Sequence, residues 1–153
     1  MSRSSLLASV LALAAAVFAP AAAAANRSYV EHIVPPGSQP LPFSDAILTG
    51  DTLYVAGHLG LDPRSGSAPS DTATEARMVM EAVKRTVESA GLRIDDLVSV
   101  TVYCTDLQLY DTFNSVYRSY FHGHYPTRAF IGTDKLLRGA HFEVQGIAIK
   151  AAP

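Results

Sequence analysis

The sequence predicts an α+β domain in which two helices pack on one face of a sheet. Two stretches, at about residues 71–91 and 107–121, repeat their apolar residues with helical spacing, and short β-branched runs flank both of them. The predicted order of elements is β, β, β, α, β, α, β, β, which favours helices on one side of the sheet. We find no repeat or linker after residue 26, so residues 26–153 are expected to form a single domain.

The N-terminal part of this domain is expected to be β-structure. A short strand begins near residue 29, and an irregular proline-rich segment follows it up to residue 42. Residues 46–48 and 53–56 are apolar and are separated by Thr49-Gly50-Asp51-Thr52, which predicts a hairpin with a positive φ angle in its turn. Residues 57–70 contain three glycines, two prolines and three serines, so a loop is expected there.

The first helix is the clearest element of the sequence. Its apolar residues recur every three or four positions: Ala76, Val79, Met80, Val83, Val87 and Ala90. Ser70 or Asp71 is expected to cap its start, and Gly91 is expected to end it in a left-handed conformation.

A central strand, a second helix and two further strands complete the prediction. Residues 97–104 are rich in β-branched side chains and are expected to form the central strand. The second helix, at about 107–121, has an aromatic face, and such a face more often belongs to the core than to a ligand site. Two final strands are expected at about 127–132 and 141–150, with a polar loop at 134–139 between them.

The N-terminus has the pattern of an export signal. Arg3 precedes an apolar run from Leu6 to Ala19, and Ala23-Ala24-Ala25 fits a cleavage site before Asn26. We therefore expect a signal peptide at 1–25 and an exported, periplasmic protein. An uncleaved anchor is the alternative, but the run is short for a bilayer span, so no stable membrane anchor is expected.

Charge and cysteine content exclude two classes of protein. The formal net charge is -2 and the basic residues are scattered, so a nucleic-acid partner is not expected. Cys104 is the only cysteine of the chain, which excludes an intramolecular disulfide. It ends an apolar run, where a buried and inert thiol is expected.

Arg128 and Glu143 are the residues that the sequence singles out for chemistry. Each lies among apolar neighbours in a predicted strand, where an unpaired charge is unfavourable. Arg128 could bind a carboxylate through its planar fork, and burial would raise the pKa of Glu143 toward the range useful for acid–base catalysis. The alternative is a structural Arg128–Glu143 salt bridge, which their positions alone slightly favour. His122 and His124 could hold a metal only with a third ligand, so no metal is expected.

Several segments resemble the Rid (reactive intermediate deaminase, YjgF-like) family. Pro126-Thr127-Arg128-Ala129-Phe130-Ile131, with Glu143 fifteen residues after the arginine, resembles the family's C-terminal signature. Leu53 to His58 is similar to its strand that ends in a Ser-Gly-Gln-type turn. The segment Val100 to Leu107 resembles its "TTVFVKDL" segment, and Asp111 to Tyr117 resembles its Asn-containing helix. The resemblance covers residues 38–150.

The resemblance implies a chorismate mutase-like fold assembled as a homotrimer, with ligand clefts at the subunit interfaces. It implies hydrolysis of reactive 2-imino or enamino acids to 2-keto acids and ammonia, with no cofactor and no metal. In that reading Arg128 holds the substrate carboxylate and Glu143 positions or activates the attacking water. Phe43, Gly57, Asn114 and Phe130 are the expected substrate-binding positions.

The chain departs from the family pattern in the expected cleft. Phe43 stands where Tyr is common, Ala56 where Ser is common, Phe130 where Cys or another small residue is common, and Gln145 where a second acid is common. The cleft loses hydroxyls and gains aromatic bulk, which predicts a changed fit for the substrate side chain.

Three readings of the function stay open at this stage. The first is an exported imine hydrolase, and the second is a non-catalytic trimer that binds small carboxylates in the same cleft. The third is a structural or protein-interaction role, such as the chaperone-like or nuclease activities claimed for some relatives. The negative net charge makes a nuclease the least attractive of these.

Overall fold

The domain is built on one mixed, six-stranded sheet. The computed structural model describes residues 26–34 and 36–151, so the predicted signal peptide lies outside the described residues. The sheet order is β1-β2-β3-β6-β4-β5. The strands are β1 (Arg27–Val30), β2 (Ala46–Thr49), β3 (Thr52–Leu59), β4 (Leu97–Cys104), β5 (Thr127–Gly132) and β6 (Phe142–Ile149). Only β4 and β5 pair in parallel; all other neighbours are antiparallel.

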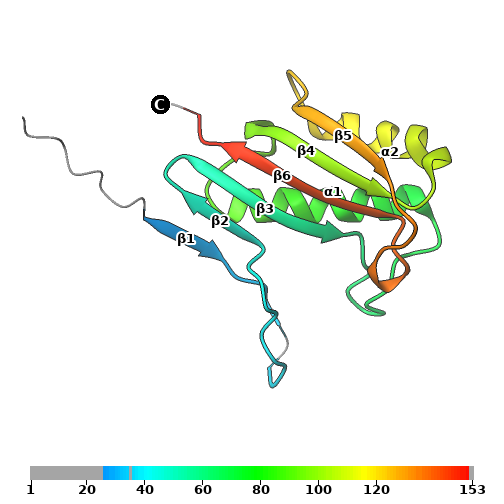
Figure 1. Ribbon diagram of the computed structural model, residues 1–153, viewed down its shortest axis with the longest axis horizontal. Helices are drawn as coiled ribbons and strands as arrows, with labels where there is room; N and C mark the ends of the chain where they lie inside the picture. Colours follow the sequence, from blue (N-terminus) through cyan, green and yellow to red (C-terminus); the bar gives the residue numbers. More distant parts are fainter. Residues whose placement is uncertain (1–25, 35, 152–153) are drawn as a thin grey trace, which may run out of the picture.

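Two helices cover one face of this sheet and confirm the predicted α+β architecture. Both α1 (Thr72–Ser89) and α2 (Tyr110–Tyr117) lie behind the sheet in the view of Figure 1, α1 across its middle and α2 near β5. Between sheet and helices lies the core, whose fully buried large side chains include Leu53, Met80, Val83, Val102, Phe113 and Phe142. Within the residues that the structure describes, no helix is long and apolar enough to cross a membrane.

Local sequence signals set the turns and helix ends as predicted. Gly50 adopts a φ of 58° in the turn between β2 and β3. Asp71 caps α1, where its carboxylate accepts a hydrogen bond from the Thr74 backbone N–H at 2.9 Å. Gly91 follows the helix with a φ of 79°, a conformation that costs glycine little.

Tertiary pairing changes the expected bounds of two elements. β3 continues to Leu59 although the glycine-rich sequence from residue 57 predicts a loop, because β6 supplies hydrogen-bonding partners to His58 and Leu59. A register shift between Val55 and His58 accommodates the change. The second helix is regular only over 110–117 and is flanked by short 3₁₀ turns at Leu107–Leu109 and Arg118–Tyr120.

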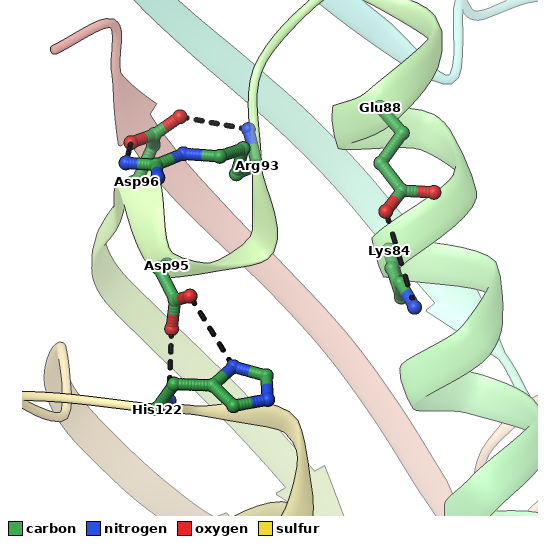
Figure 2. A network of polar contacts seen from close by, with 6 residues as sticks. All are labelled: Lys84, Glu88, Arg93, Asp95, Asp96 and His122. Carbon is green, nitrogen blue, oxygen red and sulfur yellow. Dashed lines mark hydrogen bonds and ion pairs between the residues drawn. The ribbon is translucent and has the colours of Figure 1, made fainter.

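A polar network fixes the segment that leads into β5 (Figure 2). The His122 backbone N–H donates to an Asp95 carboxylate oxygen at 3.1 Å, and His122 Nδ1 lies 3.4 Å from the other oxygen. Asp95 belongs to the turn before β4, and the neighbouring Asp96 pairs with Arg93 at 3.3 Å. The network therefore ties the start of β4 to the chain that enters β5, the strand that carries Arg128.

Candidate functional site

Arg128 lies in an aromatic cavity beside α2. The strand β5 supplies the arginine, and its Nη2 donates a hydrogen bond of 2.8 Å to the Oδ1 of Asn114, a buried residue of α2. The guanidinium carbon lies 4.6 Å from the ring centre of Tyr117 and 5.7 Å from that of Tyr110. These contacts orient the guanidinium and leave most of its five N–H donors for another partner.

Glu143 lies in a separate place, against the β3 bulge. A Cβ atom at position 57 would collide with the Glu143 carboxylate, so the lack of a side chain at Gly57 makes room for it. Burial raises the pKa of the Glu143 carboxyl above its ordinary value. The structure thus brings Gly57 and Glu143 together, and the carboxyl has the direction of pKa shift expected of a group that exchanges protons near neutral pH.

The strand registers place Arg128 and Glu143 on opposite faces of the sheet. Arg128 is paired with the core residue Val100 of β4, so it points to the helix-covered face. Glu143 is paired with Tyr103, which lies three residues after Val100 in β4. Because side chains alternate between the two faces of a strand, Tyr103 and Glu143 point to the open face, opposite to Val100 and Arg128. One copy of the chain therefore does not present both side chains to one ligand.

The structure contradicts the salt-bridge alternative for these two residues. In the described part of the chain, Arg128 forms no ion pair, and its polar partner is Asn114. The positions in sequence favoured the salt bridge because both residues lie in strands of one sheet. The two side chains cannot form this salt bridge, because they lie on opposite faces of the sheet.

The other expected ligand positions divide between the two places. Asn114 and Phe130 lie with Arg128: the Phe130 ring is 5.6 Å from its guanidinium carbon and packs edge-on against Tyr110. Gly57 lies with Glu143. Phe43 precedes β2, is 50% exposed, and forms no aromatic pair within the described residues.

Sequence reasoning missed the tyrosines that wall the Arg128 cavity. Tyr110, Tyr117 and Tyr125 line a cavity of about 320 Å³ together with Asn114 and Arg128. The aromatic face of the second helix was expected to be core, and Phe113 is fully buried as expected. Tyr110 of that face is instead 45% exposed, and Tyr125, which lies outside the predicted helix, is 55% exposed. Their position beside Arg128 follows from strand β5 packing next to α2, which sequence spacing does not show.

A buried carboxylate near the start of β6 was missed as well. Glu75 on α1 is 0% exposed, and its Oε1 accepts hydrogen bonds from the backbone N–H groups of His141 and Phe142 at 2.6 and 2.9 Å. Its Oε2 lies 2.7 Å from Nδ1 of His141, a histidine that the sequence shows only as isolated. The available signal was the position of Glu75 four residues before Val79 on the apolar stripe of the helix.

Of the remaining polar candidates, His122 pairs with Asp95 and His124 is exposed. Within residues 26–34 and 36–151, no three His, Cys, Asp or Glu side chains are grouped so that they could hold a metal. Cys104 is fully buried as predicted, its thiol donates to the Asp106 carbonyl at 3.0 Å, and burial raises its pKa. This thiol is therefore a poor nucleophile.

Comparison with known proteins relates the whole domain to one family. A family model described as Endoribonuclease L-PSP matches residues 37–150. The 2-iminobutanoate/2-iminopropanoate deaminase of Bos taurus is 34% identical over 110 residues, which cover 71% of this chain and 80% of the relative. The protein of the same name from Escherichia coli (strain K12) is 30% identical over 112 residues, which cover 71% and 88%.

Solved structures agree with this relationship. Yeast Mmf1 superposes with a TM-score of 0.73 at 26% identity, covering 82% of this chain and all 100% of its own. E. coli TdcF, solved with bound serine, superposes with a TM-score of 0.71 at 28% identity, covering 81% and 100%. Because the family model spans nearly all of the described domain and relatives reach 30% identity or more over most of their length, the chain belongs to the Rid/YjgF family, whose model is described as Endoribonuclease L-PSP.

Proposed function

We propose that the protein hydrolyses reactive 2-imino or enamino acids to 2-keto acids and ammonia. The observation that carries the proposal is the Arg128 guanidinium, which is oriented by Asn114 and aromatic rings and has no carboxylate partner among the described residues. A guanidinium held in this way is a receptor for a small carboxylate. The relatives named as 2-iminobutanoate/2-iminopropanoate deaminases support the choice of reaction.

The proposal requires more than one copy of the chain. Arg128 and Glu143 point to opposite faces of their sheet, so a cleft that holds both needs Arg128 from one copy and Glu143 from another. A closed homotrimer provides three such clefts by symmetry. The open face of the sheet carries exposed apolar side chains that a partner copy would cover, among them Tyr54, Ile131 and Ile149.

The proposed chemistry uses only side chains and water. Arg128 binds the substrate carboxylate and so fixes the imine carbon near Glu143 of the neighbouring copy. The Glu143 carboxylate takes a proton from water as the water oxygen attacks that carbon, and a tetrahedral carbinolamine forms. With a protonated imine as substrate the carbinolamine is neutral: Glu143 returns the proton to its nitrogen, the C–N bond breaks and ammonia leaves, while the hydroxyl gives its proton to Glu143 and becomes the keto oxygen. The imine carbon is already electrophilic, so the step requires no cofactor.

The test is the rate of keto-acid formation from imino acids that an amino-acid oxidase generates in situ. The wild-type protein is expected to accelerate keto-acid formation over the uncatalysed rate. Arg128→Lys keeps the charge but loses the bidentate fork, so kcat/KM is expected to fall steeply while thermal unfolding changes little. Arg77→Lys, at an exposed arginine of α1, is the matched control and should keep wild-type activity.

Two outcomes would redirect the proposal. Full turnover by a folded Arg128→Ala variant would refute the role of Arg128. Binding of a 2-keto acid without any turnover by the wild-type protein would instead support the alternative, a trimer that binds small carboxylates in the same cleft. Turnover by the wild-type protein that is lost in Glu143→Gln would assign the water-handling role to Glu143.

A further inference from the structure

We infer that the Arg128 cavity selects 2-imino acids with an aromatic side chain over those with a small aliphatic one. This inference rests on the proposed function and names the substrate class of the same site. The first observation is the pair of half-exposed rings beside the carboxylate receptor: Tyr110 and Tyr125 are 45% and 55% exposed and line the same cavity as Arg128. Large apolar surfaces of this kind gain free energy when a ligand covers them.

The wall between these two rings is also aromatic. Tyr117 lies under the guanidinium at 4.6 Å and is roughly parallel to Tyr125, with ring centres 6.4 Å apart and an interplanar angle of 25°. Its hydroxyl is buried without a hydrogen-bond partner within the described residues, so Tyr117 presents ring atoms to the cavity. Burial raises the pKa of Tyr117 to about 12, and the ring stays a neutral phenol at physiological pH.

Phe130 supports the cavity wall from strand β5, because it packs against Tyr110. Its ring meets Tyr110 edge-on, with centres 5.0 Å apart and an angle of 83°, and it also packs on the buried Phe113. The aromatic side chain that the sequence shows at this position thus connects Tyr110, a ring of the cavity, to the buried Phe113. The charged and amide groups that line the cavity are Arg118, Arg128 and Asn114, and the last two are hydrogen-bonded to each other.

The cavity size favours a ligand with a ring. A volume of about 320 Å³ is at the lower end of the range for small-molecule sites, and the methyl group of an alanine-derived imine leaves the aromatic wall uncovered. A phenyl side chain can stack on Tyr110 or Tyr125 while its carboxylate stays on Arg128. Covering the ring surface predicts a preference of about tenfold or more in kcat/KM for the aromatic imine.

The experiment compares two imines on the same preparation of the full protein. Imines are generated from phenylalanine and from alanine by an amino-acid oxidase, and the ratio of the two kcat/KM values is measured. An error in the concentration of active protein changes both kcat/KM values by the same factor, so it cancels in their ratio. We expect a ratio of about 10 or more for the wild type, and a fall toward 1 in Tyr125→Ala and Tyr110→Ala.

Two matched variants separate stacking from general damage. Tyr125→Phe keeps the ring and should keep the ratio, and Tyr29→Ala removes a 53% exposed tyrosine of β1 and should also keep it. Light scattering on each variant shows whether its assembly matches the wild type.

The outcomes distinguish this inference from the proposed function. Efficient turnover of the alanine-derived imine with a ratio of 1 or below would overturn the inference and leave the proposed function standing. If neither imine is turned over, the proposed function fails, and calorimetric binding of phenylpyruvate and pyruvate decides the inference. Tighter binding of phenylpyruvate supports it, while equal binding or no binding of either acid overturns it.

Discussion

Asn114 determines what Arg128 can bind. Its amide oxygen accepts a hydrogen bond of 2.8 Å from one guanidinium N–H, and no acid among the described residues compensates the arginine charge. An amide suits this position because it orients the arginine without neutralising it. A carboxylate at the same place would satisfy the arginine and remove the reason for it to bind a ligand.

Asn114→Asp tests this reading of the arginine. The new carboxylate is expected to pair with Arg128, so keto-acid binding and turnover should fall at least about tenfold, which corresponds to a lost charged hydrogen bond of about 1.5–3 kcal/mol. Thermal unfolding should show a folded protein. Ser115→Asp adds the same charge at an exposed position of α2 and should keep wild-type binding. Unchanged binding in Asn114→Asp would contradict the role given to the amide.

The raised pKa of Glu143 predicts a pH profile. Burial raises the pKa of this carboxyl above its ordinary value, so kcat/KM should fall as the pH is lowered through a pKa above that of an exposed glutamate. The native state binds this proton more tightly than the unfolded chain, so the group's contribution to stability is lost as pH rises through the native pKa.

Glu143→Gln should therefore abolish turnover without lowering the melting temperature at pH 7. Glu88→Gln, at an exposed acid of α1, is the control and should leave both the activity and its pH profile unchanged. A Glu143→Gln variant that keeps the acid limb of the profile would assign that limb to another group.

Glu75 connects helix α1 to the beginning of strand β6. Its buried carboxylate accepts two backbone N–H groups and contacts the His141 imidazole, and Glu143 follows two residues after His141. Gly60 lets the chain that follows β3 pass close to Glu75, because a Cβ atom at position 60 would collide with the Glu75 backbone and side chain. These contacts hold the strand end that carries Glu143 at a fixed distance from the helix.

Glu75→Ala is expected to destabilise the fold more than any exposed substitution on the same helix. It leaves two backbone donors without an acceptor and removes the partner of the partly exposed His141 imidazole, at a cost of about 3 kcal/mol or more. Glu75→Gln keeps an accepting oxygen and should cost less. Chemical denaturation of both variants beside Glu88→Ala measures the difference, and equal midpoints for all three would show that the contacts add nothing.

The assembly of whole molecules decides whether the site exists. In the proposed site Arg128 and Glu143 meet only between two copies of the chain. A substitution that dissociates the oligomer should therefore also abolish activity. Ile131 and Ile149 lie on the open face of the sheet with 42% and 47% of their surface exposed. A charge placed there would be buried unpaired in a trimer interface.

Ile131→Lys should convert a trimer into monomers and abolish imine hydrolysis. Light scattering on the wild-type protein should give three times the mass of one chain, and the variant should give the mass of one. Val98→Lys, at another exposed apolar residue, tests whether the effect depends on position. An active wild-type monomer would refute the two-copy site.

Export is a separate property of the whole chain and stays a prediction. The apolar run and Ala23-Ala24-Ala25 predict cleavage before Asn26. Intact-mass analysis of the protein from its exporting cell should show a chain that begins at or near Asn26. A full-length chain in the cytoplasmic fraction would contradict the predicted signal peptide.

The sequence was sufficient for most of the elements and for naming Arg128 and Glu143 as candidates. Apolar spacing predicted α1, β-branched residues predicted β4, and the turn sequence at Gly50 predicted the hairpin, because these signals are local and are not changed by distant contacts. The motif around Arg128 and the spaced Glu143 gave the family. The extension of β3 to Leu59 was not predictable, because it depends on hydrogen bonds from β6, which lies more than eighty residues later in the chain.

The tertiary structure alone placed the candidate residues relative to one another. Side chains alternate between the two faces of a strand, so the face of Arg128 depends on its register with β4, and the face of Glu143 depends on the register of β6. A shift of one residue in either register would have put both on one face. Pairing between distant strands sets those registers, which is why two residues of one sequence motif lie on opposite faces of the sheet in the folded chain.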